Sequence, residues 1–139
     1  MPSFSQTSKK RLATCDQRLQ DILNEAIEII DFAVLEGHRS KGRQDELFEA
    51  GKSKLEWPNS NHNFYPSRAV DIAPWLREVK IDWDDLILFG RLMGVIQAIA
   101  HKHGVRIRFG LDWDGDMRSV NRDPDEGFLD APHIELVDP

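Results

Sequence analysis

The sequence predicts an α+β domain in which a small antiparallel sheet packs against helices. Two long segments, residues 8–30 and 82–103, carry apolar residues at helical spacing, and a shorter helix is expected between them. Four short apolar segments have the length and composition of strands. The chain has 139 residues, the length of one ordinary domain and too short for two. We therefore expect a single domain over residues 1–139, with metal candidates at the ends of strands.

The first predicted helix covers residues 8–30. Ser8 is its expected N-cap, because a serine hydroxyl can accept a hydrogen bond from the unpaired N–H groups of a first helical turn. The apolar residues that follow recur every three or four positions and would form one buried face. They are Leu12, Cys15, Leu19, Ile22, Leu23, Ala26, Ile27 and Ile30.

Two further helices are expected. One is short, around residues 43–50, and would end at Gly51, because glycine readily adopts the left-handed conformation that closes a helix. The other covers residues 82–103 and is apolar on most sides, so we expect it to be the most buried helix. Its apolar residues include Leu86, Ile87, Phe89, Met93, Ile96, Ile99 and Ala100.

The strands and loops follow from composition. Residues 51–68 are rich in Asn, Ser, Pro and aromatic residues, which indicates an ordered loop rather than a linker. Residues 110–131 are polar, acidic and irregular. The predicted strands are residues 32–35, 69–73, 105–109 and 133–137.

The charge of the chain argues against nucleic acid as a partner. The sequence has 18 basic and 24 acidic residues and a formal net charge of -6. A field of this sign does not attract a nucleic acid or an anionic membrane surface. We therefore expect no nucleic-acid partner.

The cysteine content and the N-terminal sequence indicate the cellular compartment in which the protein folds. Cys15 is the only cysteine, which excludes an internal disulfide and a thiolate zinc cluster and suits a reducing compartment. The N-terminus lacks the basic region and apolar run of a secretory signal, and no apolar stretch is long enough to cross a bilayer. We expect a protein made in the cytoplasm, with no signal peptide and no membrane insertion.

Two histidines and one aspartate are candidates for a zinc site. His62 lies on the predicted loop, Asp71 in a predicted strand and His133 at the start of the last one. Two imidazoles and one carboxylate leave a fourth position for water, which is typical of catalytic rather than structural zinc. Asp130 would stand beside that water as its base. By itself, the pair of His62 and Asp71 is better explained as a surface histidine and a strand-end aspartate, so the hypothesis depends on context.

That context resembles the zinc-dependent peptidoglycan peptidases, which include D-alanyl-D-alanine carboxypeptidases and phage endolysins that cleave the L-alanyl-D-glutamate bond. The resemblance covers most of the chain and depends on five motifs in the same order. The stretch between the second and third motifs is longer than in many members. The motifs are Gly37-His38-Arg39-Ser40 with Gln44 and Leu47, Ser60-Asn61-His62, Ala69-Val70-Asp71, Phe109-Gly110-Leu111-Asp112-Trp113 and Asp130-Ala131-Pro132-His133.

The resemblance implies a metal site and a base. His62, Asp71 and His133 would bind zinc. Asp130 would accept the proton of the attacking water and return it to the leaving amine. Many relatives carry glutamate at this position. Because aspartate is one methylene shorter, its reach to the water requires a closer backbone.

The resemblance also implies contacts with the substrate. Arg39 would bind a substrate carboxylate or the polarised carbonyl, because a guanidinium group holds planar oxyanions with paired hydrogen bonds. Gln44 and Ser60 would hydrogen-bond the peptide stem, and Trp113 would form an apolar wall over it. On residue type alone, Arg39 would be a solvated loop residue and Trp113 a core residue.

The function implied by the resemblance is that of a phage-type endolysin, a zinc endopeptidase that cuts peptidoglycan stem peptides between L-alanine and D-glutamate. Its partner would be bacterial peptidoglycan, and it would act as a monomer. It would accumulate in the cytoplasm of the infected host and reach the cell wall once the inner membrane is opened. Two alternatives stay open. One is a D-alanyl-D-alanine carboxypeptidase or dipeptidase on the same scaffold, and the other is a non-catalytic, zinc-stabilised cell-wall binding domain.

An acidic stretch in the last loop is a candidate calcium site. Asp112, Asp114, Asp116 and Asp123 stand at positions one, three, five and twelve of a calcium-loop pattern. The usual glycine at position six is missing, and the last carboxylate is aspartate rather than glutamate. An acidic, solvated loop is therefore the alternative. Bound calcium would order this loop beside the zinc site.

Overall fold

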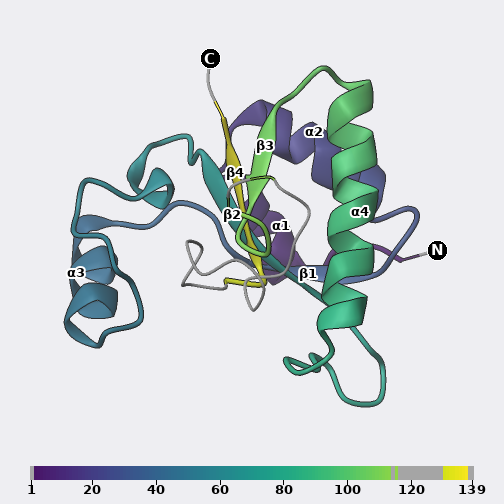
Figure 1. Ribbon diagram of the computed structural model, residues 1–139, viewed down its shortest axis with the longest axis horizontal. Helices are drawn as coiled ribbons and strands as arrows, with labels where there is room; N and C mark the ends of the chain where they lie inside the picture. The colour runs from purple at the N-terminus through teal and green to yellow at the C-terminus, as the bar shows by residue number, and fades with distance from the viewer. Residues whose placement is uncertain (1, 114, 116–129, 138–139) are drawn as a thin grey trace.

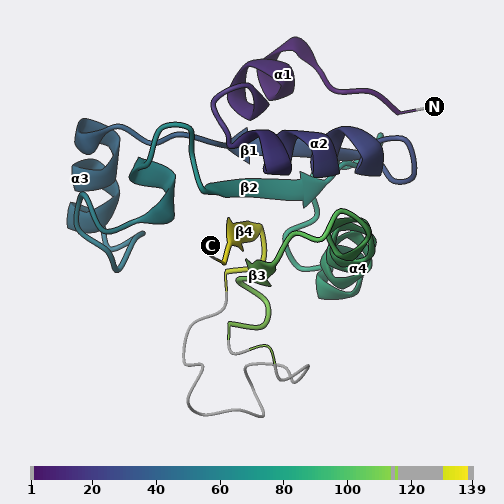
Figure 2. The same cartoon turned by 90° about the horizontal axis from the view of Figure 1, so that it is seen from above.

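Four strands form one antiparallel sheet, which confirms the predicted α+β fold. The computed structural model describes residues 2–113, 115 and 130–137. Figure 2 shows the strands in the order β1-β2-β4-β3, and each neighbouring pair is antiparallel. Each strand lies within two residues of its predicted range. The strands are β1 (Phe32–Glu36), β2 (Ala69–Pro74), β3 (Ile107–Phe109) and β4 (His133–Leu136).

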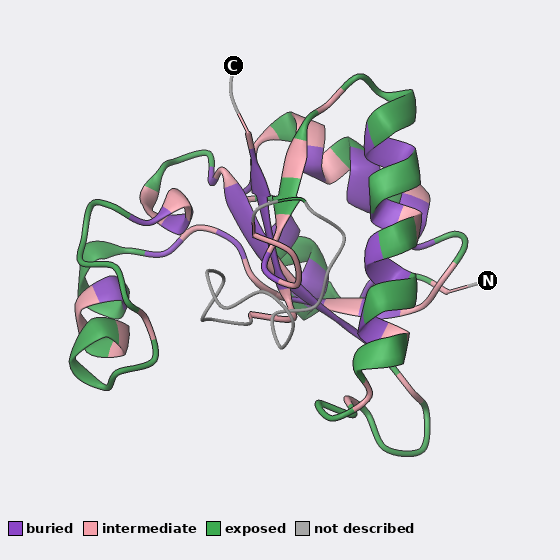
Figure 3. Ribbon diagram, in the orientation of Figure 1, coloured by how far each residue is buried: buried purple, intermediate pink, exposed green. Residues whose placement is uncertain are grey.

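The helices lie on two sides of the sheet. α2 (Gln17–Ala26) and α4 (Leu86–Lys102) pack against each other, and α1 (Gln6–Leu12) packs on β1. Figure 1 shows α3 (Lys41–Glu49) on the far side of the sheet from α4, together with the short 3-10 helix η1 (Asn61–Asn63), which contacts β2. Figure 3 shows buried residues along β2, β4 and the facing sides of α2 and α4. The apolar core therefore lies on the α2 and α4 side of the sheet.

The predicted single helix over residues 8–30 is wrong, because the chain forms two helices there. α1 begins after Ser5, whose hydroxyl accepts a hydrogen bond from the Ser8 N–H at 3.1 Å. α2 begins after Asp16, which is its N-cap. Ser8 is not a cap, since its buried hydroxyl accepts a hydrogen bond from the Val34 N–H at 3.0 Å.

The break between α1 and α2 arises because the chain makes lateral hydrogen bonds there. The Asp16 N–H donates to the Ser67 carbonyl at 2.8 Å, and the Ser67 N–H donates to the Thr14 carbonyl at 2.8 Å. Between them, Cys15 is 1% exposed, and burial raises the pKa of its thiol to about 12. Apolar periodicity does not reveal the break, because both helices present their apolar sides to the same core.

α3 and α4 confirm the other two predicted helices, with one correction. α3 is followed by Gly51, which has a φ of 73°. α4 begins at Leu86, where Asp85 caps it. Leu86 and Ile87 are 45% and 88% exposed, so α4 buries one face rather than most sides. Within the described part of the chain, no helix has the length and apolar character needed to cross a membrane.

Candidate active site

Three side chains from separate parts of the chain converge beside β2 and β4. Asp71 lies within β2 and pairs with His133, the first residue of β4, so both side chains project from the same face of the sheet. His62 comes from η1. Asp71 Oδ1 lies 3.2 Å from His62 Nε2 and 3.2 Å from His133 Nδ1, and these two nitrogens are 3.3 Å apart. The structure thus brings together the three residues expected to bind zinc.

The spacing of these atoms fits a four-coordinate metal ion. Zinc binds imidazole nitrogen and carboxylate oxygen at about 2.0–2.1 Å, so two ligands of a tetrahedron stand about 3.3–3.4 Å apart. The three distances found here are close to that value. Among the described residues, the group of His62, Asp71 and His133 could hold a metal ion. Three protein ligands leave the fourth position of such an ion for water or substrate.

Each histidine is oriented by a hydrogen bond through its other ring nitrogen. His62 Nδ1 donates to the Gly37 carbonyl at 2.8 Å, and His133 Nε2 donates to Glu135 Oε1 at 2.7 Å. Arg108 holds Glu135 in turn, since its Nε donates to Glu135 Oε2 at 3.2 Å. Metal-binding histidines commonly have such partners, which fix the ring and the nitrogen that faces the ion. Neither Glu135 nor Arg108 was predicted, although a spacing of two residues in a strand places His133 and Glu135 on one face.

Charges of both signs surround the cluster. Burial opposes the charged form of His133, but hydrogen bonds to Asp71 and Glu135 outweigh burial and raise the pKa of His133 to about 9. Burial also opposes ionisation of Asp71, but the two histidines outweigh it and hold the pKa of this carboxyl far below its ordinary value. For Glu135, His133 and Arg108 outweigh burial and lower the pKa to about 2. In the metal-free protein, His133 is therefore a cation between two carboxylates at neutral pH.

Arg39 is held in a network of hydrogen bonds. Its side chain is 9% exposed, and its Nε and Nη2 donate to the two Glu36 carboxylate oxygens at 3.0 and 3.1 Å. Its Nη1 donates to Gln44 Oε1 at 2.9 Å. Arg39 Nη2 also lies 3.8 Å from Asp71 Oδ2, the oxygen that does not face the histidines. Arg39 therefore orients Asp71 and still borders the pocket described below, while its predicted contact with substrate stays a prediction.

Gln44 and Ser60 support the site from inside the protein. Gln44 has no exposed surface, and its Nε2 donates to Ser53 Oγ at 2.9 Å and to the Leu55 carbonyl at 2.6 Å. Because its amide is fully buried and used within the protein, the geometry gives no support to the predicted hydrogen bond from Gln44 to substrate. Ser60 borders the pocket but is 4% exposed, and its hydroxyl caps η1 by accepting from the His62 N–H at 3.2 Å.

Asp130, the predicted base, lies beside the cluster. Its Oδ2 is 3.9 Å from His133 Nδ1, the nitrogen that faces Asp71, and its side chain is 32% exposed. Burial, followed by the negative charge of Asp71, raises the pKa of Asp130. A carboxyl group in this position can take up and release a proton next to the open coordination position.

Gly110 fixes the backbone of Asp130. The Asp130 N–H donates to the Gly110 carbonyl at 3.0 Å, and the Gly110 N–H donates to the His133 carbonyl at 2.8 Å. A Cβ atom at residue 110 would lie 2.0 Å from the Asp130 carbonyl oxygen. Only glycine permits this close approach, which explains the glycine that follows Phe109 in the motif.

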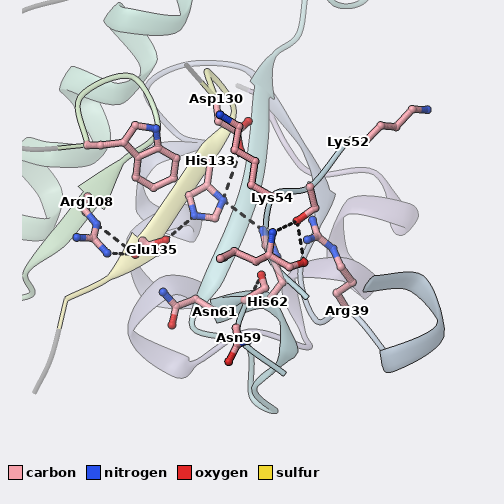
Figure 4. A pocket seen from close by; sticks show the side chains of 14 residues that line it. Arg39, Lys52, Lys54, Asn59, Asn61, His62, Arg108, Asp130, His133 and Glu135 are labelled. Atoms are coloured by element: carbon pink, nitrogen blue, oxygen red, sulfur yellow. Dashed lines mark hydrogen bonds and ion pairs between the residues drawn. The ribbon is translucent and has the colours of Figure 1, made fainter. Parts of the chain in front are cut away.

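A pocket of about 330 Å³ lies over the cluster (Figure 4). Trp113 forms part of its wall, with its ring centroid 5.2 Å from that of His133 and the two ring planes inclined by 39°. Asp130 and Arg108 also line it, and the loop after α3 contributes Lys52 and Lys54. The pocket is therefore the place where a substrate can meet Asp130 and the two histidines of the cluster, His62 and His133.

The predicted calcium loop is described only in part. Asp112 forms an isolated bridge with Phe109 and borders a second pocket together with Trp113. Asp114, Asp116 and Asp123 lie outside the described residues. Calcium binding therefore stays a prediction.

Three side chains that could hold a metal ion, with a carboxyl group beside them, are features of hydrolytic enzymes, and the class of protein that this fold and site indicate is a hydrolase. Comparison with known proteins agrees. The model of the phage L-alanyl-D-glutamate peptidase family matches residues 2–137. The chain belongs to this family.

Individual relatives cover nearly the same length. The L-alanyl-D-glutamate peptidase of Escherichia phage T5 is 31% identical over 138 residues, with 96% of this chain and 97% of the relative covered. The peptidoglycan L-alanyl-D-glutamate endopeptidase CwlK of Bacillus subtilis is 28% identical over 115 residues, with 78% of this chain and 62% of the relative covered. The crystal structure of the Serratia marcescens L-Ala D-Glu endopeptidase ChiX matches with a TM-score of 0.75 at 22% identity, covering 98% of this chain and 91% of that one. At this identity, the last match shows the fold alone.

Glu135→Gln should weaken metal binding by about 10–100-fold, the usual effect of removing a group that orients a ligand histidine. The neutral amide holds the His133 ring less strongly than the carboxylate does. Zinc affinity would be measured by competition with a chromophoric chelator. Glu28→Gln, a change of the same kind at an exposed position, is the control and should bind zinc like the unmodified protein. Equal affinities for both variants would contradict the role assigned to Glu135.

Proposed function

We propose that this chain is a zinc endopeptidase that hydrolyses the stem peptides of bacterial peptidoglycan between L-alanine and D-glutamate. The observation that carries the proposal is the spacing of the three candidate ligand atoms, 3.2, 3.2 and 3.3 Å, with a carboxyl oxygen of Asp130 3.9 Å from one of them. The family and the names of the relatives support the choice of bond. Residues 1–139 would form one catalytic domain.

Zinc is the ion that we propose for these ligands. His62 Nε2, His133 Nδ1 and Asp71 Oδ1 would hold it, and a mixed set of imidazoles and one carboxylate favours zinc over magnesium or calcium, which prefer oxygen ligands alone. When bound, zinc would polarise the carbonyl of the scissile bond and lower the pKa of a water molecule.

Asp130 would move the protons in this reaction. Its raised pKa and its place beside the cluster suit it to accept a proton from the attacking water. The same carboxyl group would then donate this proton to the nitrogen of the leaving D-glutamate residue. Arg39 would stabilise the negative charge that develops on the carbonyl oxygen, and Trp113 would exclude water from one side of the pocket.

The biological role that we propose is host cell lysis by a phage. The family is a phage family, and one relative is a phage peptidase. The protein would act as a monomer on the cell wall, from the cytoplasm of the infected bacterium, once the inner membrane is opened.

Two alternatives are less well supported. A D-alanyl-D-alanine carboxypeptidase on the same scaffold would use the same metal ligands, but the relatives are named for the L-alanyl-D-glutamate bond. A non-catalytic zinc-stabilised binding domain would need neither an open coordination position nor an adjacent carboxyl group of raised pKa.

Digestion of purified peptidoglycan tests the bond. We expect fragments with new C-terminal L-alanine and new N-terminal D-glutamate, identified by mass spectrometry. Their release should stop when a chelator removes zinc and resume when zinc is restored. Free D-alanine as the only product would instead establish the carboxypeptidase.

Asp130→Asn and His133→Ala should separate catalysis from metal binding. Asp130→Asn should bind zinc normally and lower kcat by about 10²–10⁴-fold, because it removes the proton acceptor. His133→Ala should lose zinc as well as activity. Zinc content and kcat would be measured on the same preparations, with Asp84→Asn at an exposed position as the control. Near-normal turnover in Asp130→Asn would exclude Asp130 as the base.

Zinc binding at about pH 7 should release close to one proton from His133. In the metal-free protein the pKa of His133 is about 9, so below this pH the proton occupies the ring and zinc has to displace it. Affinity should therefore rise about tenfold per pH unit between about pH 7 and pH 9 and level off above. Calorimetry in buffers of different ionisation enthalpy counts the protons, and zero protons released would contradict the charge state assigned to His133.

A further inference from the structure

A β-bulge in β1 turns the side chain of Glu36 toward the candidate site. Because alternate residues of a regular strand share a face, Glu36 would otherwise lie on the same face as Val34, which is fully buried in the apolar core. The pairing of β1 with β2 shifts between these two residues, and Glu36 stands opposite Asp71. The extra residue, Leu35, packs against the core. Bulges commonly re-aim a side chain in this way, so Glu36 lies on the face of the sheet that carries Asp71.

The carboxylate of Glu36 holds one edge of the Arg39 guanidinium group. Arg39 Nε donates to Glu36 Oε1 at 3.0 Å and Arg39 Nη2 donates to Glu36 Oε2 at 3.1 Å, which is the paired geometry that suits a guanidinium and a carboxylate. Arg43 Nε, from α3, lies 3.5 Å from the same Glu36 Oε1. The side chains of Glu36 and Arg39 are 21% and 9% exposed, so water competes little for this pair. The contact therefore fixes the plane of the guanidinium group.

This contact also decides which N–H groups of Arg39 are left for the site. A guanidinium group has five N–H groups, and Glu36 takes one from Nε and one from Nη2. Arg39 Nη1 donates to Gln44 Oε1 at 2.9 Å. The N–H groups that remain belong to Nη1 and Nη2, and Nη2 lies 3.8 Å from Asp71 Oδ2. Because Arg39 also lines the pocket (Figure 4), these N–H groups are the ones available to Asp71 and to a ligand.

We propose that Glu36 is a positioning residue for peptide hydrolysis, which acts through Arg39 and keeps its remaining N–H groups turned toward the carbonyl oxygen of the scissile bond. The inference rests on the proposed function, which assigns Arg39 to the negative charge that develops on this oxygen. Glu36 does not line the pocket, so it acts without touching the substrate. A hydrogen-bond donor that is already oriented before the reaction stabilises the transition state without a cost of reorganisation.

The variant Glu36→Gln tests this role. The glutamine side chain has the same size, but its amide presents a donor where the second acceptor oxygen was, so it can no longer hold both N–H groups of Arg39. With the zinc-loaded protein and an N-acetylated stem peptide, kcat should fall by about 10–100-fold, as expected when a group that acts on the reacting atoms is misplaced. KM should stay within about twofold, because Arg39 acts on a charge that develops only in the transition state.

A double-mutant cycle shows whether Glu36 acts through Arg39. Arg39→Ala should lower kcat by about 10²–10³-fold, and Glu36→Gln should have no further effect when it is added to Arg39→Ala. The control is Glu46→Gln, which removes an exposed carboxylate 4.0 Å from Arg43 and should keep the kcat of the unmodified protein. An unchanged kcat in Glu36→Gln, or an equal loss with and without Arg39, would overturn the positioning role and leave the proposed function intact.

Two further measurements do not depend on turnover. In the NMR spectrum of the unmodified protein, the Nε–H proton of Arg39 should exchange slowly with water, and this exchange should be about tenfold faster in Glu36→Gln but unchanged in Glu46→Gln. Zinc content should be equal in all three proteins, because Glu36 holds none of the candidate metal ligands directly. Fast exchange in the unmodified protein, or loss of zinc in Glu36→Gln, would contradict the role of Glu36. Failure of the unmodified protein to cleave the peptide would overturn the proposed function and the positioning role with it.

Discussion

The candidate site depends on one oxygen atom, Asp71 Oδ1, which faces the ring nitrogens of both histidines at 3.2 Å. The oxygen stands there because Asp71 and His133 are direct partners in the pairing of β2 with β4. Val70 and Ile72, on either side of Asp71, are fully buried on the opposite face. A slip of one residue in this pairing would turn Asp71 into the core and an apolar side chain toward the pocket. Burial of apolar side chains on one face of the sheet therefore determines the geometry of the other face.

A line of alternating charges crosses the sheet through the carboxylate of Asp71. A buried charge is costly unless an opposite charge lies beside it, and removing one partner of a buried pair typically costs about 3–5 kcal/mol. Here the line follows the strand order. Glu36 belongs to β1 and Arg39 to the turn after it, Asp71 belongs to β2, His133 and Glu135 belong to β4, and Arg108 belongs to β3. Each member is a neighbour of the next through a hydrogen bond or ion pair, so the site and the sheet stabilise each other. The members are Glu36, Arg39, Asp71, His133, Glu135 and Arg108.

Sequence patterns predict those features of the structure that depend on residues close together in the chain. The fold class and the strand ranges follow from composition and length, and motif order singles out His62, Asp71 and His133. The break between α1 and α2 does not follow, because it depends on hydrogen bonds to Ser67, far along the chain. Gln44 shows a second limit: a motif marks the residue, but only the fold shows that its side chain points inward to support Arg39. Strand alternation places Glu135 on the same face as His133, but it does not predict the pairing of Glu135 with Arg108. This pairing depends on β3 lying beside β4.

The short side chain of Asp130, the candidate base, and Gly110, the residue that follows β3, depend on each other. An aspartate side chain is one methylene shorter than a glutamate side chain, so the place of its carboxyl group depends closely on the place of its backbone. The Asp130 N–H donates to the Gly110 carbonyl at 3.0 Å, and the His133 N–H donates to the Asp130 carbonyl at 3.1 Å. A side chain at residue 110 would collide with that carbonyl, since its Cβ would lie 2.0 Å away. The Asp130 carboxyl group already lies 3.9 Å from His133 Nδ1. The close approach of Gly110 to the Asp130 backbone therefore helps to set the distance between this carboxyl group and His133.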